Sequence, residues 1–183
     1  SGIIHSQSYK QVLVRKEIYD SQWFTDSKLN FAQNLLRFND DHTAIISHRE
    51  NYPSIKISYK QLNELVTRTA FGLKNLGVKK GDRVAAFISN VPEAVITMLA
   101  VTSLGAIWSS TSPDFGIQGV IDRFGQIEPK VFLAIKSYYY NGKHIDCGDK
   151  INSIVEKISS IEKVILVDEF NDFSKSDLGY NNL

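Results

Sequence analysis

Residues 76–134 read LGVKKGDRVAAFISNVPEAVITMLAVTSLGAIWSSTSPDFGIQGVIDRFGQIEPKVFLA, and their apolar runs and turn residues predict the order strand, helix, strand, helix, strand. Pro92 suits the first turn of a helix, and Gly105 suits the left-handed residue that follows one. Ser112 and Pro113 are expected to be the N-cap and the first residue of the second helix. The expected strands are residues 83–89, 106–109 and 131–135, and the first helix is residues 92–104.

This alternation predicts the fold class. The helix at residues 92–104 is apolar on nearly all sides, so we expect it to be buried. Strands that alternate with helices of this length pair in parallel through crossover connections. We therefore expect an α/β fold with a doubly wound, mostly parallel sheet of about four strands, flanking helices and an added β-hairpin.

The segments upstream of residue 76 predict the hairpin and two helices. Apolar runs at residues 44–48 and 54–58 indicate two paired strands. Ser58 and Gln61 fit a capping box at the start of the next helix, which Gly77 ends. The buried face of that helix is expected to consist of Leu62, Leu65, Val66, Thr69, Leu73 and Leu76.

The first 42 residues are expected to form an N-terminal extension with one packing helix, at residues 29–38 with Ser27 as its N-cap. This helix should pack on the outside of the α/β domain, through a face made of Leu29, Ala32, Leu35 and Leu36. Residues 9–14 are interpreted as an edge strand. Residues 43–183 would then be the first α/β subdomain of a larger domain.

Downstream of residue 135, the sequence KSYYYNGKHID predicts a polar loop at residues 136–146. Asp149 is expected to cap a helix, and residues 163–167 are expected to form the fourth strand. Residues from 168 onward are polar and rich in turn formers, which is typical of a surface loop or a frayed end. The apolar face of the last helix is expected to be Ile151, Ile154, Val155 and Ile158.

The composition excludes several classes of function. The 183 residues are 43% hydrophobic and 22% charged with a net charge of +1, so neither nucleic acid nor a membrane is expected as a partner. No apolar run is long enough to span a bilayer. The single cysteine, Cys147, fits a reducing cytoplasm and is interpreted as a packing residue. The four histidines do not combine with Cys or carboxylates at metal-ligand spacing, so we expect no metal site.

Residues 77–110, GVKKGDRVAAFISNVPEAVITMLAVTSLGAIWSS, resemble the acyl-CoA synthetases of the adenylate-forming, AMP-binding superfamily. The alternative is a generic βαβ unit in which Gly and Pro only mark turns. The residues that fall in register with the family pattern are Gly77, Gly81, Asp82, Pro92, Glu93, Gly105 and Ala106.

The resemblance also implies motifs that these 183 residues do not contain. Members of the superfamily hold ATP phosphates with a Ser/Thr/Gly-rich loop followed by Lys, and they use a Lys in a C-terminal domain for adenylation. The chain is therefore interpreted as the N-terminal part of a longer enzyme, without catalytic residues or tightly bound cofactors of its own.

A candidate ligand site lies in the loops at the carboxyl ends of the predicted strands, where open α/β sheets bind ligands. In the acetyl-CoA synthetases, a basic R-x-G-R segment at this place contacts the CoA nucleotide. Tyr140-Asn141-Gly142-Lys143 aligns with it, with Tyr140 in place of the first basic residue. The resemblance therefore implies a CoA-binding site at Asp114, Tyr140, Gly142 and Lys143. The alternative is that Lys143 is a solvated charge and the tyrosines pack on the surface.

Two further segments, residues 108–116 and 120–130, resemble the acetoacetate-activating branch of the family more than the acetate-activating branch. This resemblance implies an acid–thiol ligase that uses acetoacetate, ATP and CoA, with Mg²⁺ neutralising the phosphates. The chain's other expected partner is the remainder of its own polypeptide. The alternatives are an acetyl- or propionyl-CoA synthetase, or a non-catalytic α/β binding module.

Overall fold

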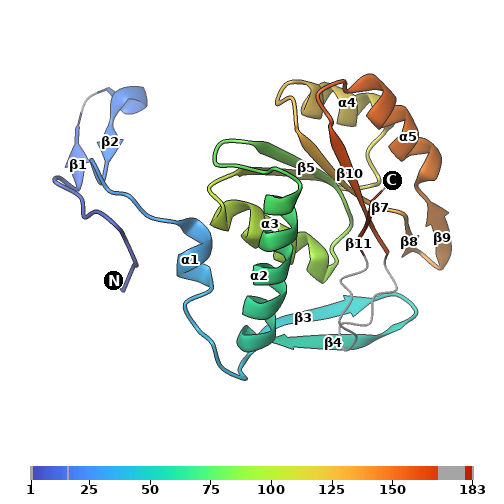
Figure 1. Ribbon diagram of the computed structural model, residues 1–183, viewed down its shortest axis with the longest axis horizontal. Coiled ribbons are helices and arrows are strands. Elements are labelled where there is room, and N and C mark those ends of the chain that lie inside the picture. The colour runs from blue at the N-terminus through green and yellow to red at the C-terminus, as the bar shows by residue number, and fades with distance from the viewer. Residues whose placement is uncertain (1, 16, 169–179, 183) are drawn as a thin grey trace.

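The computed structural model describes residues 2–15, 17–168 and 180–182, and a five-stranded sheet lies at its centre (Figure 1). The strand order is β11-β10-β7-β5-β6. Four of these strands are parallel, as the sequence predicts, and β11 pairs antiparallel with β10. The strands are β5 (Arg83–Phe87), β6 (Ile107–Thr111), β7 (Val131–Ile135), β10 (Lys163–Val167) and β11 (Tyr180–Asn182).

Strand β11 corrects one expectation. Residues 180–182 belong to the segment predicted to be a surface loop or a frayed end, but their backbone extends the sheet beyond β10. The pairing could not be predicted from these polar residues, because an edge strand needs only backbone hydrogen bonds to one neighbouring strand. The rest of that expectation, for residues 169–179, lies outside the described residues.

Helices cover both faces of the sheet (Figure 1). Helices α2 (Tyr59–Asn75) and α3 (Pro92–Ser103) pack against each other on one face, and α4 (Ile117–Gly125) and α5 (Gly148–Lys157) pack on the other. This doubly wound arrangement follows from the connections, since α3 leads from β5 to β6 and α4 leads back across β5 to β7. Right-handed crossovers in opposite directions place their helices on opposite faces.

The core lies where the central strands meet the helices. Residues 84–87 of β5 and all of β7 are completely buried, which explains why their sequences are continuous apolar runs rather than alternating ones. Helix α3 is buried through Ile96, Leu99 and Ala100, as its apolar sequence predicts. Each fully buried aliphatic side chain contributes roughly 1.5–3 kcal/mol to folding, so this interior is the main source of stability.

The predicted start of α2 is confirmed. The Ser58 hydroxyl accepts a hydrogen bond from the Gln61 N–H at 3.2 Å, and the Gln61 side chain accepts one from the Ser58 N–H at 2.9 Å. Gly77 and Gly105 follow α2 and α3 with φ of +84° and +71°, as expected for left-handed residues after a helix. The predicted hairpin is also confirmed, with β3 (Thr43–Arg49) paired antiparallel to β4 (Tyr52–Ser58).

The predicted first helix is shorter than expected and has another cap. Helix α1 is Phe31–Leu35, its N-cap is Asn30 rather than Ser27, and it packs against α3 outside the sheet. The Asn30 side chain accepts from the Gln33 N–H and also donates to the Thr102 carbonyl. This second bond, to the end of α3, ties the cap to the tertiary structure, whereas the Ser27 hydroxyl donates to the Gln7 carbonyl. Of the expected apolar face, Ala32 is buried, Leu36 is half-buried, and Leu29 and Leu35 are exposed.

The N-terminal residues form an arm that extends away from the sheet (Figure 1). In it, β1 (Leu13–Val14) pairs antiparallel with β2 (Gln22–Trp23), and a short 3₁₀ turn, η1 (Ile18–Asp20), lies between them. The edge strand predicted at residues 9–14 is therefore limited to its last two residues.

Two more helix starts differ from the predictions. Helix α4 begins at Ile117 after the N-cap Gly116, because the Ser112 hydroxyl bonds to Asp114 within a turn instead of capping the helix. Helix α5 begins at Gly148, so Asp149 lies inside its first turn and is not the N-cap. There its negative charge still favours the positive end of the helix dipole.

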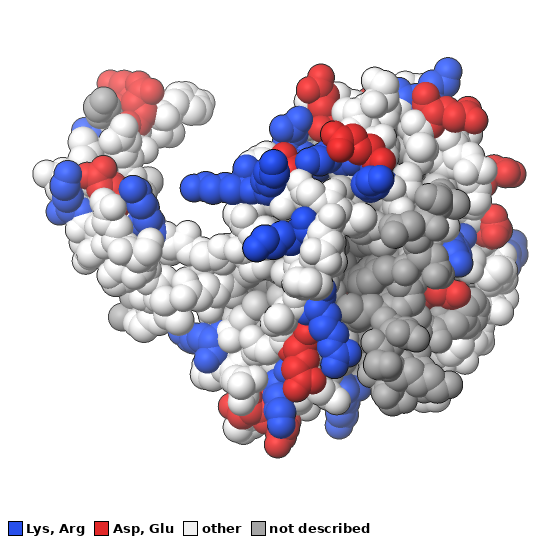
Figure 2. All heavy atoms as spheres, in the orientation of Figure 1, with Lys and Arg blue, Asp and Glu red and all other residues white. Residues whose placement is uncertain are grey.

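On the face shown in Figure 2, Lys and Arg are interspersed with Asp and Glu, in keeping with the net charge of +1. Among the described residues, no helix combines the length and the apolar character that crossing a membrane requires.

Candidate ligand-binding site

A cavity of about 400 Å³ lies at the carboxyl ends of β5, β6 and β7. From β5 the chain passes to β6 on one side, and it then crosses back to β7 on the other side of β5. The neighbouring strands β5 and β7 therefore form a topological switch point. Open α/β sheets bind ligands at such points. The cavity is lined by Ile88, Ser89, Asn90, Ala94, Ser110, Thr111, Ser112, Asp114, Tyr138, Tyr139 and Tyr140.

Asp114 organises one side of this cavity. Its Oδ1 accepts a hydrogen bond from the Tyr138 hydroxyl at 2.6 Å, and its Oδ2 accepts one from the Ser112 hydroxyl at 2.8 Å. The Tyr138 hydroxyl, and to a lesser degree that of Ser112, holds the pKa of the Asp114 carboxyl below its ordinary value of 3.8. Burial, together with the bond to Asp114, raises the pKa of Tyr138. Asp114 is therefore an anion, and Tyr138 a proton donor to it, throughout the physiological range.

Two other hydroxyl groups of the cavity have no such partner. The Ser89 Oγ and Thr111 Oγ1 atoms are buried and make no hydrogen bond within the described part of the chain. Thr111 ends β6 and Ser89 follows β5, so both lie at the switch point. Buried polar atoms normally have a partner, so a polar ligand or water at this place would satisfy them.

Residues 136–146 form a β-hairpin rather than the polar loop that the sequence predicted. Strand β8 (Ser137–Tyr140) pairs antiparallel with β9 (Lys143–Asp146). The turn between them is Asn141-Gly142, with φ of +51° and +73°. Positive φ at both positions defines the tight turn that Asn-Gly favours, so this dipeptide was the signal that could have predicted the hairpin.

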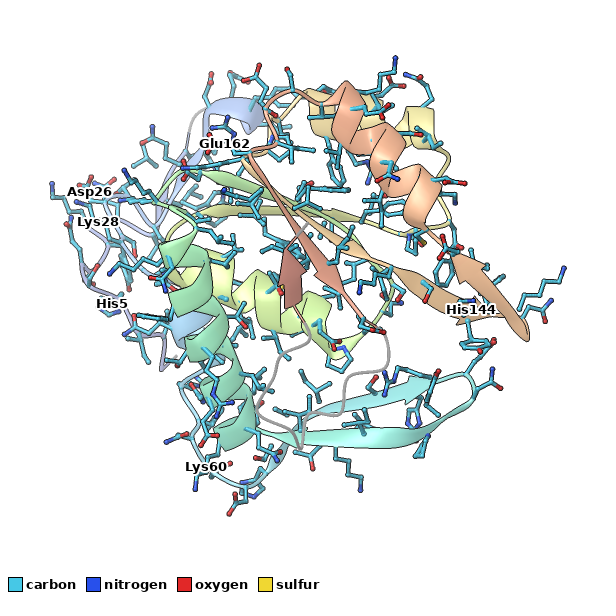
Figure 3. The ribbon with its side chains drawn as sticks, turned by 45° about the vertical axis from the view of Figure 1, so that its right-hand side comes forward. His5, Asp26, Lys28, Lys60, His144 and Glu162 are labelled. Carbon is cyan, nitrogen blue, oxygen red and sulfur yellow. The ribbon has the colours of Figure 1, made fainter. Side chains whose placement is uncertain are left out.

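The structure brings two of the four predicted CoA-binding residues together. Asp114 and Tyr140 both line the cavity, whereas Gly142 and Lys143 lie at the exposed tip of the β8–β9 hairpin. Figure 3 labels His144 on this hairpin and Lys60 in the first turn of α2, and the two lie well apart in that view. The N–H groups of Asn141 and Gly142 already donate to the Glu50 carboxylate, a contact that the sequence did not reveal.

Cys147 and the possible metal ligands are the other residues examined for a chemical role. Cys147 is completely buried, and this burial raises the pKa of its thiol to about 11, which opposes formation of a nucleophilic thiolate. The described residues include no group of three or more His, Cys, Asp or Glu that could hold a metal ion.

The comparison with known proteins agrees with the observed fold. Residues 31–181 match the AMP-binding enzyme family, and the chain belongs to this family. It is similar to an acetoacetyl-CoA synthetase of Macaca fascicularis, with 41% identity over 182 residues, which cover 97% of the chain and 27% of that relative. It is also similar to an acetoacetyl-coenzyme A synthetase of Rhizobium meliloti (strain 1021), with 41% identity over 158 residues, which cover 86% of the chain and 24% of that relative.

Among solved structures, the chain resembles an acetoacetyl-CoA synthetase from Streptomyces lividans with a TM-score of 0.86 and 29% identity, over 99% of the chain and 30% of that structure. This likeness confirms the predicted α/β fold class. The chain spans about a quarter of the length of the curated relatives that it matches.

Proposed function

We propose that the protein containing this chain is an acetoacetate–CoA ligase. The observation that carries the proposal is the 41% identity to an acetoacetyl-CoA synthetase over 97% of the chain, which extends far beyond the family pattern of residues 77–110. In the proposed reaction, the carboxylate of acetoacetate attacks the α-phosphorus of ATP and releases pyrophosphate. The CoA thiolate then attacks the acyl carbon of acetoacetyl-AMP and releases AMP, giving acetoacetyl-CoA.

In this proposal the chain contributes a CoA-nucleotide site, made by Asp114, Tyr140, Gly142 and Lys143. We assign the neutral part of the nucleotide to the cavity, because its lining has hydroxyl groups, an amide, tyrosine rings and the Asp114 carboxylate but no Lys or Arg. A base can stack on an aromatic ring and hydrogen-bond to Ser89 and Thr111. Lys143, at the hairpin tip, supplies a positive point charge for a phosphate, and Gly142 shapes the turn that presents it.

ATP and Mg²⁺ enter the proposal only as reactants of the whole enzyme. When bound, Mg²⁺ would neutralise the phosphate charge of ATP. These 183 residues do not contain the Ser/Thr/Gly-rich loop followed by Lys that the family resemblance implies for ATP phosphates, so we assign no ATP contact to them.

The test is product analysis with the full-length protein, ATP, acetoacetate and CoA. The proposal predicts that acetoacetyl-CoA, AMP and pyrophosphate form in a ratio of one to one to one. Formation of ADP and phosphate would contradict the adenylate mechanism. A purified protein that forms no acyl-CoA from acetoacetate, acetate or propionate would favour the non-catalytic binding module.

A further inference from the structure

Glu50 joins two hairpins that are distant in sequence. It lies at the turn between β3 and β4, and its two carboxylate oxygens accept hydrogen bonds from consecutive backbone N–H groups of the β8–β9 turn. The Asn141 N–H donates to Oε1 at 2.9 Å, and the Gly142 N–H donates to Oε2 at 3.0 Å. Consecutive N–H groups in such a turn form a concave site for an anion, and Glu50 supplies that anion from within the chain.

The β8–β9 hairpin depends on contacts of this kind. It is a separate two-stranded sheet, and a two-stranded hairpin alone is only marginally stable in water. Its base is held by the bond from the Tyr138 hydroxyl to Asp114 and by the bond from the Cys147 N–H to the Lys136 carbonyl. At its exposed tip, the Glu50 carboxylate holds both N–H groups of the turn.

The position of the tip matters for the cavity. Tyr138, Tyr139 and Tyr140 of β8 form one wall of it. A second cavity of about 140 Å³ is bordered by Glu50 and lies between the two hairpins. It shares four lining residues with the first cavity: Ser89, Asn90, Tyr138 and Tyr139. The Tyr52 and Tyr139 rings also meet edge to face across this gap, with centroids 6.2 Å apart. A shift of the tip would therefore displace the wall of the ligand cavity.

We propose that Glu50 is a positioning residue for the CoA-nucleotide site. Its carboxylate fixes the Asn141-Gly142 turn and thereby determines the positions of the flanking residues Tyr140 and Lys143. This inference rests on the proposed function. Glutamine is the sharpest replacement for Glu50, since it keeps the length of the side chain but changes one of the two acceptor oxygens into a donor that cannot accept from an N–H.

The experiment compares the full-length Glu50→Gln protein with the wild type by amide hydrogen exchange and by steady-state kinetics. We expect the amides of Asn141 and Gly142 to exchange at least about tenfold faster, because a charge-assisted bond is lost. We expect the KM for CoA to rise about three- to tenfold, with kcat and the KM for ATP within about twofold. Glu64→Gln, which removes an exposed carboxylate from α2, should change none of these values.

Three results would overturn the inference. Unchanged exchange at Asn141 and Gly142 would show that Glu50 does not hold the turn. Faster exchange with an unchanged KM for CoA would show that the turn does not position the site. Faster exchange throughout the protein would assign Glu50 a role in global stability instead. Failure of the proposed function is a separate result, because a wild-type protein that forms no acyl-CoA still allows the exchange measurement.

Discussion

The Asp114 side chain connects two segments of the site through hydrogen bonds. The hydroxyls of Tyr138 and Ser112 both donate to its carboxylate, and the first of these bonds ties the β6–α4 loop to the base of the β8–β9 hairpin. A hydrogen bond to a charged acceptor contributes more to stability than one between neutral groups. Asp114 itself is exposed, so solvent weakens the electrostatic part of this contribution.

We predict that Tyr138→Phe lowers the free energy of unfolding by about 1 kcal/mol at pH 7, because the buried ring is kept and one charge-assisted bond is lost. The pKa of Asp114 is lowered in the folded state, so its ionised form stabilises the fold above the unfolded value of 3.8. That contribution is lost as the pH falls through the folded-state pKa. The difference between wild type and variant should therefore shrink below about pH 3.8.

Urea denaturation between pH 7 and pH 3 measures this difference. Tyr139→Phe is the matched control, since the Tyr139 ring contacts Tyr52 and His144 while its hydroxyl makes no described bond to Asp114. A difference for Tyr138→Phe that stays constant across this pH range would contradict the assigned role of the bond.

Lys143 carries the second prediction at the scale of the residue. In the full-length protein, Lys143→Ala should raise the KM for CoA about fivefold with little change in kcat, which corresponds to the loss of about 1 kcal/mol from one exposed charged contact. Lys60→Ala is the control, because Lys60 is an exposed lysine at the start of α2, far from the hairpin (Figure 3). An unchanged KM for CoA in Lys143→Ala would count against the proposed nucleotide site.

At the scale of the element, the features that could be predicted were those that local chemistry determines. The apolar runs of β5 and β7, the capping box of α2 and the left-handed Gly105 each depend on a few adjacent residues. The N-cap Asn30 could not be predicted in this way, because part of its bonding goes to Thr102 at the end of α3. The β8–β9 hairpin could have been predicted from Asn141-Gly142, but the polar residues around this dipeptide favoured a loop.

Helix α2, whose capping box was predicted from the sequence, also allows a test of stability. We predict that Ser58→Ala destabilises the protein by about 1 kcal/mol, because one half of the capping box is lost and the Gln61 N–H is left without its acceptor. Thermal or chemical denaturation measures the change. Ser159→Ala, at an exposed serine after α5, should alter stability by less than about 0.5 kcal/mol. Equal effects of the two substitutions would show that the cap does not stabilise α2.

At the scale of the whole molecule, the strand order places the cavity. The chain passes from β5 to β6 on one side and then crosses back to β7 on the other, and the loops that follow β5, β6 and β7 carry Ser89, Asp114 and the tyrosines of β8, in that order. The sequence analysis predicted a ligand site at this edge of the sheet, with Asp114 and Tyr140 among its residues. It could not indicate the contacts of Asp114 with Tyr138, 24 residues away, or of Glu50 with Asn141, 91 residues away, because only the tertiary structure brings them together.

The choice of acyl substrate is a property proposed for the whole protein. The proposal of acetoacetate rests on identity to acetoacetyl-CoA synthetases along nearly the entire chain. A pocket built for acetoacetate must accommodate two more carbons and a keto oxygen than one built for acetate. A buried donor placed for that oxygen would be left unpaired by acetate, which penalises the smaller acid.

The most direct test of the proposed acetoacetate–CoA ligase activity is therefore the ratio of kcat/KM for acetoacetate to kcat/KM for acetate. Both values are measured with the full-length protein at saturating ATP and CoA. A hydrogen bond that only acetoacetate can make predicts a preference for acetoacetate of at least about tenfold. Equal values for the two acids, or a preference for acetate, would contradict the assignment to acetoacetate and favour an acetyl-CoA synthetase.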